Sequence, residues 1–121
     1  MHRFRQVALI TFWLSVILSV SLALMPTPPQ VPTDRFGDKF NHMLAFATMT
    51  ALVLAAYPRM PRLRLAERLS FLGALIEVGQ SIPALHRDCD IRDWIADTLA
   101  ILTVVGIAAL LRLWSESRAS R

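Results

Sequence analysis

The chain has 121 residues, of which 55% are hydrophobic, and a mean hydropathy of +0.47, a composition typical of membrane proteins rather than of soluble ones. Its net charge of +4 comes from basic residues that flank apolar blocks, where they act as topology signals, so we exclude a nucleic-acid partner. The single cysteine, Cys89, excludes an internal disulfide and any CxxC site, which leaves an unremarkable thiol or an intermolecular bridge.

Apolar residues fall into four blocks, which predict an all-α, four-helix transmembrane bundle forming one domain over residues 1–121. A spanning helix needs about 20 apolar residues, with about 17 as the lower limit. The third block has only 14 residues even with Glu77 counted, so it is the weakest span. The blocks are Val7 to Met25, Phe40 to Tyr57, Leu69 to Ile82 and Trp94 to Leu111. We expect helices at about residues 7–25, 39–57, 67–83 and 92–114.

The first block follows a basic start, which is also the outline of a secretory signal. Its apolar run is longer than the roughly 7 to 15 residues of a signal core, and no A-x-A-like site precedes Pro26. We therefore interpret it as a retained helix, with a signal peptide as the alternative.

The segment after the first block contains Pro26, Pro28, Pro29 and Pro32, which forbid a helix and favour an extended loop. The second helix then begins at Asp38, where a carboxylate can cap free backbone N–H groups and meet the positive end of the helix dipole. Asp38, Lys39 and His42 share one face of this helix. An imidazole one turn inside the apolar boundary needs a polar partner.

The distribution of basic residues predicts that both termini are cytoplasmic. Nine Arg residues lie before the first block, between the second and third, and after the fourth, whereas the other two loops hold only Arg35, Lys39, Arg87 and Arg92. The basic loop between the second and third blocks is interpreted as a topology anchor, with anionic lipid recognition as the alternative.

The third and fourth helices each carry a polar stripe near the outer side of the membrane. Glu77, Gln80 and Ser81 lie at i, i+3 and i+4, and Asp90, Asp93 and Asp97 lie at i, i+3 and i+7. Charged side chains at bilayer depth are costly, so they normally face a protein interior and pair with one another. We therefore expect the stripes to meet in one polar site made of Asp38, Lys39, His42, Glu77, Gln80, Arg87, Asp90, Asp93 and Asp97.

The ordered motifs D-K-x-x-H, E-x-x-Q and R-x-x-D-x-x-D, which run from Asp38 to Asp93, resemble those of the VanZ-like family of small bacterial membrane proteins. The resemblance extends to Ala100 and implies a multi-pass protein of the bacterial cell membrane, in a family whose best-known member is linked to teicoplanin resistance. The family usually continues the last aspartate as D-x-x-x-N-x-x-G. This chain has Asp97 and Ala100 at those positions.

Three functions fit the predicted site. In the first, Lys39 and Arg87 bind an anionic outer-leaflet lipid, a glycan-lipid or a glycopeptide-related ligand. In the second, the carboxylates and His42 hold a divalent cation or perform acid–base catalysis, although HExxH, G-x-S-x-G and P-loop motifs are all absent. His86 is either a further ligand or a solvated loop residue. In the third, buried ion pairs only fix the helix register.

Overall fold

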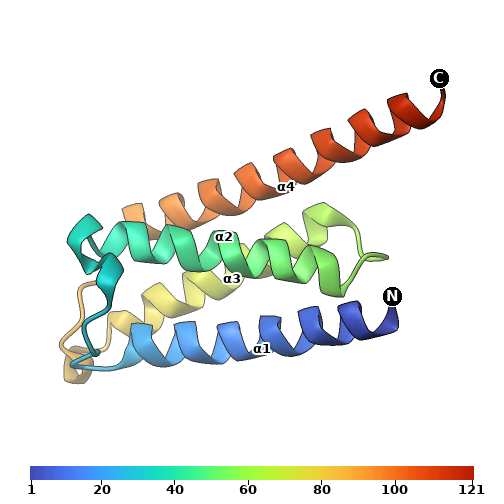
Figure 1. Ribbon diagram of the computed structural model, residues 1–121. Coiled ribbons are helices and arrows are strands. Elements are labelled where there is room, and N and C mark those ends of the chain that lie inside the picture. Colours follow the sequence, from blue (N-terminus) through green and yellow to red (C-terminus); the bar gives the residue numbers. More distant parts are fainter.

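The computed structural model describes all 121 residues as an antiparallel, up-and-down arrangement of four α-helices, which confirms the predicted all-α fold (Figure 1). The α-helices are α1 (His2–Leu24), α2 (Asp38–Ala56), α3 (Arg62–Gln80) and α4 (Ile91–Ala119), and the connecting 3-10 helices are η1 (Pro32–Phe36) and η2 (Pro83–Leu85). Helices α1, α2 and α4 are each long and apolar enough to cross a membrane.

Helix α3 is as long as α2 but more highly charged, and so does not reach the apolar character of the other three. It begins at Arg62, before the predicted residue 67, because the Arg, Leu, Ala and Glu residues of its basic start are strong helix formers. The same preference carries α4 to Ala119, beyond the predicted residue 114, where Arg112 Nε donates to Glu116 Oε1 at 2.8 Å.

The loop from Met25 to Gly37 is tied to the first turn of α2 by Asp34. One oxygen of Asp34 accepts the backbone N–H of Val31 at 2.8 Å, and the other accepts Asn41 Nδ2 at 2.7 Å. Gly37 then turns the chain with a φ of 94°, a conformation that side chains with a Cβ rarely adopt. These contacts fix where α2 begins, and therefore where Asp38 lies.

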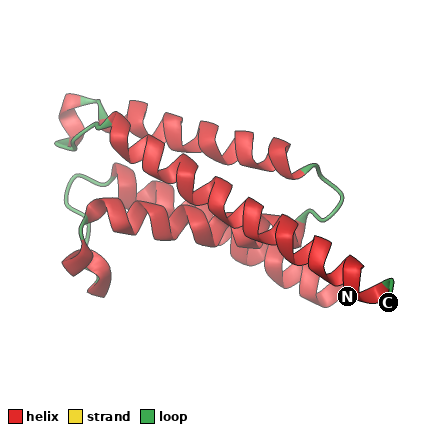
Figure 2. Cartoon of the chain, turned by 90° about the horizontal axis from the view of Figure 1, so that it is seen from above, coloured by secondary structure: helices red, strands yellow, loops and turns green.

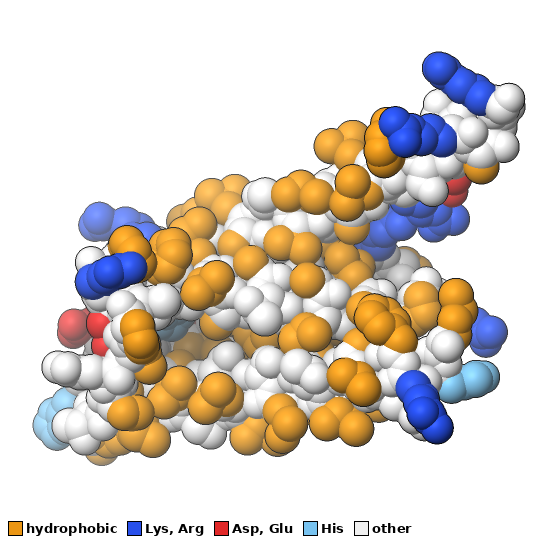
Figure 3. Space-filling view, viewed as in Figure 1, with side chains coloured by type: hydrophobic (Ala, Val, Ile, Leu, Met, Phe, Trp, Pro, Cys, Tyr) orange, Lys and Arg blue, Asp and Glu red, His pale blue; other side chains and the backbone are white.

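Helix α2 packs between α1 and α4, and α3 packs chiefly against α4 (Figures 1 and 2). Only 21 of the 121 residues are buried, so the core is a narrow apolar strip around Phe46, Met49 and Ile101. Large apolar side chains such as Ile17 and Leu99 instead cover the outside of the bundle, and charged groups gather at its two ends (Figure 3). This is the surface expected of a helix bundle surrounded by lipid.

The loops between α1 and α2 and between α3 and α4 share one end of the bundle, which we call the polar end. Both chain termini and the α2–α3 loop lie at the opposite, basic end (Figure 1). Helix α1 is tied to the rest at both ends: Gln80 Nε2 donates to the carbonyl of Ala23 at 2.9 Å, and Arg5 Nε donates to the carbonyl of Ala56 at 3.0 Å.

The packing of α1 on α3 predicts different effects for two glycine substitutions. A Cβ on Gly79 would lie 2.7 Å from Leu24 Cδ2, whereas a Cβ on Gly106 would meet nothing within 4 Å. Alanine is a better helix former than glycine by about 1 kcal/mol. We expect Gly106→Ala to raise the thermal unfolding temperature in detergent, and Gly79→Ala to lose this gain because Leu24 must move.

Leu24→Ala provides the control for this comparison. It removes the obstructing atoms, so Gly79→Ala made in the Leu24→Ala background should recover the gain seen at Gly106. Equal gains at both glycines in the otherwise unchanged protein would show that α1 and α3 do not touch at Gly79.

Candidate functional site

Ionisable side chains of three helices converge at the polar end, because the antiparallel topology brings the starts of α2 and α4 beside the end of α3. We call this group the polar cluster, and it consists of Asp38, Lys39, His42, Glu77, Asp93 and Asp97.

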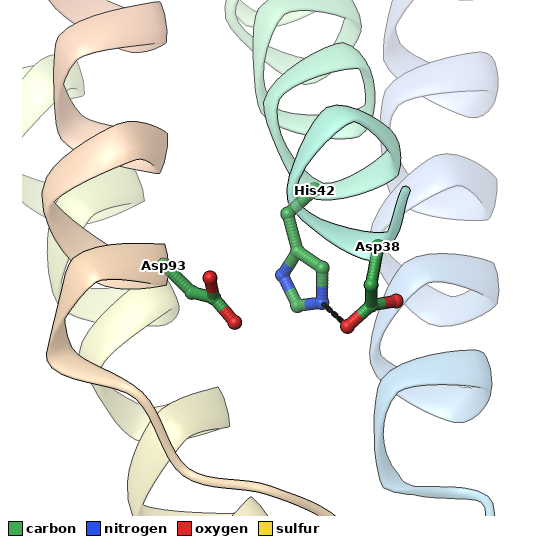
Figure 4. A group of neighbouring side chains, drawn as sticks. All are labelled: Asp38, His42 and Asp93. Atoms are coloured by element: carbon green, nitrogen blue, oxygen red, sulfur yellow. Dashed lines mark ion pairs between the residues drawn. The ribbon is translucent and has the colours of Figure 1, made fainter. Parts of the chain in front are cut away.

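His42 lies at the centre of the polar cluster and is only 9% exposed. Its Nε2 atom is 3.6 Å from Asp38 Oδ2, and its Nδ1 atom is 3.8 Å from Asp97 Oδ2. Figure 4 shows the imidazole between Asp38 on its own helix and Asp93 on α4. Hydrogen bonds from nitrogen to oxygen are usually about 2.9 to 3.0 Å long, so both contacts are ion-pair distances that a small movement would turn into hydrogen bonds.

The carboxylate of Asp97 is fully buried, yet neither of its oxygens has a hydrogen-bond partner within the protein. Gly73 on α3 lies beside this side chain, and a Cβ there would be in ordinary van der Waals contact with Asp97 Oδ2, at 3.6 Å. Glu77 is also buried: its Oε2 accepts the backbone N–H of Asp90 at 3.0 Å, while its Oε1 has no partner. Buried acceptors without partners cost about 1–3 kcal/mol each, and more when they are charged.

Lys39 lies at the mouth of the polar cluster, where its Nζ atom is 3.8 Å from Asp93 Oδ1. The lysine side chain is 47% exposed and the aspartate side chain is 13% exposed. Lys39 is the only lysine or arginine of the cluster, which otherwise contains one imidazole and the carboxylates of Asp38, Glu77, Asp93 and Asp97. The cluster is therefore rich in acid, and its chemistry favours cations or protons at its centre.

Three residues of the predicted site are not part of the polar cluster. Gln80 points to α1, where its amide donates to Ala23. Asp90 is the N-cap of α4, and its Oδ1 accepts the backbone N–H of Arg92 at 2.9 Å. Arg87 is half-buried in the loop and forms neither an ion pair nor a side-chain hydrogen bond.

The structure also joins polar residues that the motifs did not include. Trp94 Nε1 donates to the carbonyl of Ser70 at 3.0 Å, and the Ser70 and Thr98 hydroxyls lie 2.8 Å apart. These residues line a largely apolar groove of about 440 Å³ between α3 and α4. The available signal was spacing, because Ser70 precedes Glu77 by two helical turns and Thr98 lies four residues after Trp94 on the same face of α4.

Comparison of the chain with protein-family models, with curated proteins and with solved structures finds no match. The geometry of the polar cluster is therefore the basis for assigning a function.

The two aspartates of α4 should respond differently to loss of charge. Asp97 lies about 6 Å further along the helix than Asp93. It is fully buried without a hydrogen-bond partner, so an amide of the same shape should be tolerated in Asp97→Asn. Asp93→Asn should lower stability more, because it removes the ion-pair partner of the half-exposed Lys39, whereas Asp97→Asn removes no hydrogen bond.

Membrane levels and thermal unfolding in detergent measure both effects. Equal damage from the two variants, or greater damage from Asp97→Asn, would mean that Asp97 is ionised and depends on its charge.

Proposed function

We propose that this protein is a small multi-pass protein of the bacterial cell membrane, similar to the VanZ-like family. It binds the anionic headgroup of an outer-leaflet lipid or glycan-lipid at its polar end. The observation that carries the proposal is the opening of the polar cluster at the end of the bundle. Lys39 and Asp38 are exposed there, while His42 and Asp97 lie behind them.

The groove between α3 and α4 supports a ligand with an acyl chain. Its lining is mostly apolar, it would open toward lipid in the proposed topology, and it includes Trp94, the neighbour of Asp93 in sequence. A chain lying in this groove places its headgroup beside the mouth of the polar cluster. The amphipathic Trp94 is suited to that level of the membrane, because indole rings favour the interface.

Cationic side chains around the mouth supply contacts for a phosphate or carboxylate. Arg35, Lys39 and Arg92 are exposed at this end, and Arg87 is half-buried there without an ion-pair partner. Charge-assisted hydrogen bonds from guanidinium and ammonium groups to phosphate are about twice as strong as neutral ones.

In the proposed topology all four helices cross the membrane, both termini are cytoplasmic and the polar end faces outward. A depression of about 320 Å³ at the basic end is lined by Arg5, Arg59 and Arg64, which suits the anionic inner surface of a membrane. The charges of α3 also fit a short span, because Arg62 to Arg68 lie at the basic end and Glu77 lies at the polar end.

Two further roles use the same cluster. A membrane-embedded metal-dependent or acid–base enzyme is favoured by the approach of carboxylates to both nitrogens of His42. A purely structural role is less well supported, because side chains that only fix helix register would be expected to satisfy the buried oxygens of Asp97 and Glu77.

The topology is tested by labelling introduced cysteines in intact cells with a membrane-impermeant maleimide. The background is Cys89→Ser, since Cys89 is exposed at the same end. Partial loss of water and the nearby Glu77 carboxylate raise the pKa of the Cys89 thiol, which would make its own labelling slow. Thr33→Cys should react and Arg64→Cys should react only after lysis. The reverse pattern would place the polar end in the cytoplasm.

Headgroup binding is tested with purified protein in a zwitterionic detergent and short-chain lipids of defined headgroup. We expect phosphatidylglycerol to bind more tightly than phosphatidylcholine, and Lys39→Gln to reduce this preference by about 10-fold, the effect of losing one charge-assisted contact. Arg121→Gln, at the other end of the chain, is the matched control. Equal binding of the two lipids, or an unchanged preference in Lys39→Gln, contradicts the proposal.

A further inference from the structure

We infer that Asp38, His42 and Asp93 form a binding site for one divalent metal ion of the Zn²⁺ and Mn²⁺ class, with Asp97 orienting the imidazole from behind. The site needs no lipid, so it can be tested independently of headgroup recognition.

The three residues already bring their ligand atoms together. One nitrogen of His42 and one oxygen from each aspartate all lie within 4.8 Å of one another (Figure 4). Two ligands of a tetrahedral metal, each about 2.1 Å away, are about 3.4 Å apart. The longest separation must therefore shorten by up to about 1.4 Å, and the exposed Asp38 side chain in the first turn of α2 is free to move by this amount.

The two sides of the His42 ring have different surroundings. Nε2 faces the exposed Asp38, and Nδ1 faces the buried Asp97. Histidines that bind metals usually donate their second N–H to a carboxylate, which fixes the tautomer and the ring orientation. When Nε2 binds the metal, Nδ1 carries the proton and donates it toward Asp97 Oδ2.

The unpartnered carboxylate of Asp97 is the second, independent observation. Its side chain is 1% exposed, it faces the ring nitrogen opposite Asp38, and neither oxygen has a hydrogen-bond partner. A buried acceptor in that state is costly unless a donor is held toward it. A metal-bound imidazole is such a donor, because coordination of Nε2 leaves Nδ1 protonated.

The charge of the cluster also fits a divalent cation. Four carboxylates face one lysine and one imidazole, and Lys39 is exposed enough to swing into water when a metal takes Asp93. A single imidazole with two carboxylates suits Zn²⁺ or Mn²⁺, whereas Ca²⁺ and Mg²⁺ favour oxygen ligands alone. Three protein ligands leave coordination positions for water or, if the proposed headgroup binding holds, for a phosphate oxygen.

Metal binding is measured on the full-length protein in detergent, purified without a histidine tag, treated with chelator and freed of lipid additives. Mn²⁺ is titrated while the electron paramagnetic resonance signal of the free ion is followed, and Zn²⁺ is then added as a competitor. We expect one bound Mn²⁺ per chain, displaced by Zn²⁺. Mn²⁺ should also raise the thermal unfolding temperature.

Matched pairs of variants separate this site from the rest of the surface. Asp38→Asn and His42→Gln should weaken Mn²⁺ binding at least 10-fold, and Asp97→Asn should weaken it about 10-fold through the ring. Asp88→Asn and His86→Gln, both in the exposed α3–α4 loop, should bind as the unchanged protein does. Because Asp38 is exposed, Asp38→Asn keeps the test valid even if His42→Gln does not fold.

Two outcomes overturn the inference. One is the absence of saturable Mn²⁺ or Zn²⁺ binding in the unchanged protein, and the other is equal loss in Asp38→Asn and Asp88→Asn, which means surface binding only. If Mn²⁺ binds but phosphatidylglycerol and phosphatidylcholine bind equally well, the metal site is supported and headgroup recognition is rejected. If phosphatidylglycerol is preferred but no metal binds, headgroup recognition is supported and the metal site is rejected.

Discussion

The constraint on which the polar end depends is the cost of keeping a carboxylate in the dry interior of the bundle. Asp97 is fully buried, and each buried acceptor without a hydrogen-bond partner costs about 1–3 kcal/mol. His42 limits this cost by placing a ring nitrogen 3.8 Å from one of the Asp97 oxygens. The position of α2 against α4 is therefore tied to a single acid.

Two helix starts make an acidic cluster tolerable at this end of the bundle. Helices α2 and α4 both begin here, with Asp38 and Asp93 in their first turns, and the free N–H groups of a helix start favour negative charge by about 0.3 to 1 kcal/mol. Glu77, at the end of α3, accepts a backbone N–H from Asp90, the cap of α4.

The sequence was sufficient to predict four helices and the shared faces of Asp38 with His42 and of Asp93 with Asp97, because both follow from apolar blocks and helical spacing. Spacing could not place Gln80. Gln80 lies only about 60° around α3 from Glu77, so the two residues were expected to share a face. The last carbonyls of α1 have no partners within their own helix, however, and the Gln80 amide donates to one of them, that of Ala23. Ser70 and Thr98 were missed because isolated hydroxyls in apolar runs usually bond their own backbone. Thr98 does donate to the carbonyl of Trp94 in its own helix, but its hydroxyl also lies 2.8 Å from that of Ser70 on the neighbouring helix.

The exposed fraction of the side chains decreases from the surface of the polar cluster to its interior, from 66% for Asp38 and 47% for Lys39 to 1% for Asp97. The His42 ring joins the two extremes, with Nε2 toward the exposed acid and Nδ1 toward the buried one. A neutral imidazole carries its proton on only one nitrogen. A group that binds Nε2 on the Asp38 side therefore also determines whether Nδ1 can donate a hydrogen bond to Asp97. A metal or a headgroup held at the mouth would thereby change the hydrogen bonding of a carboxylate in the core. This coupling needs no movement of the backbone, because the imidazole itself connects the surface of the bundle to its interior.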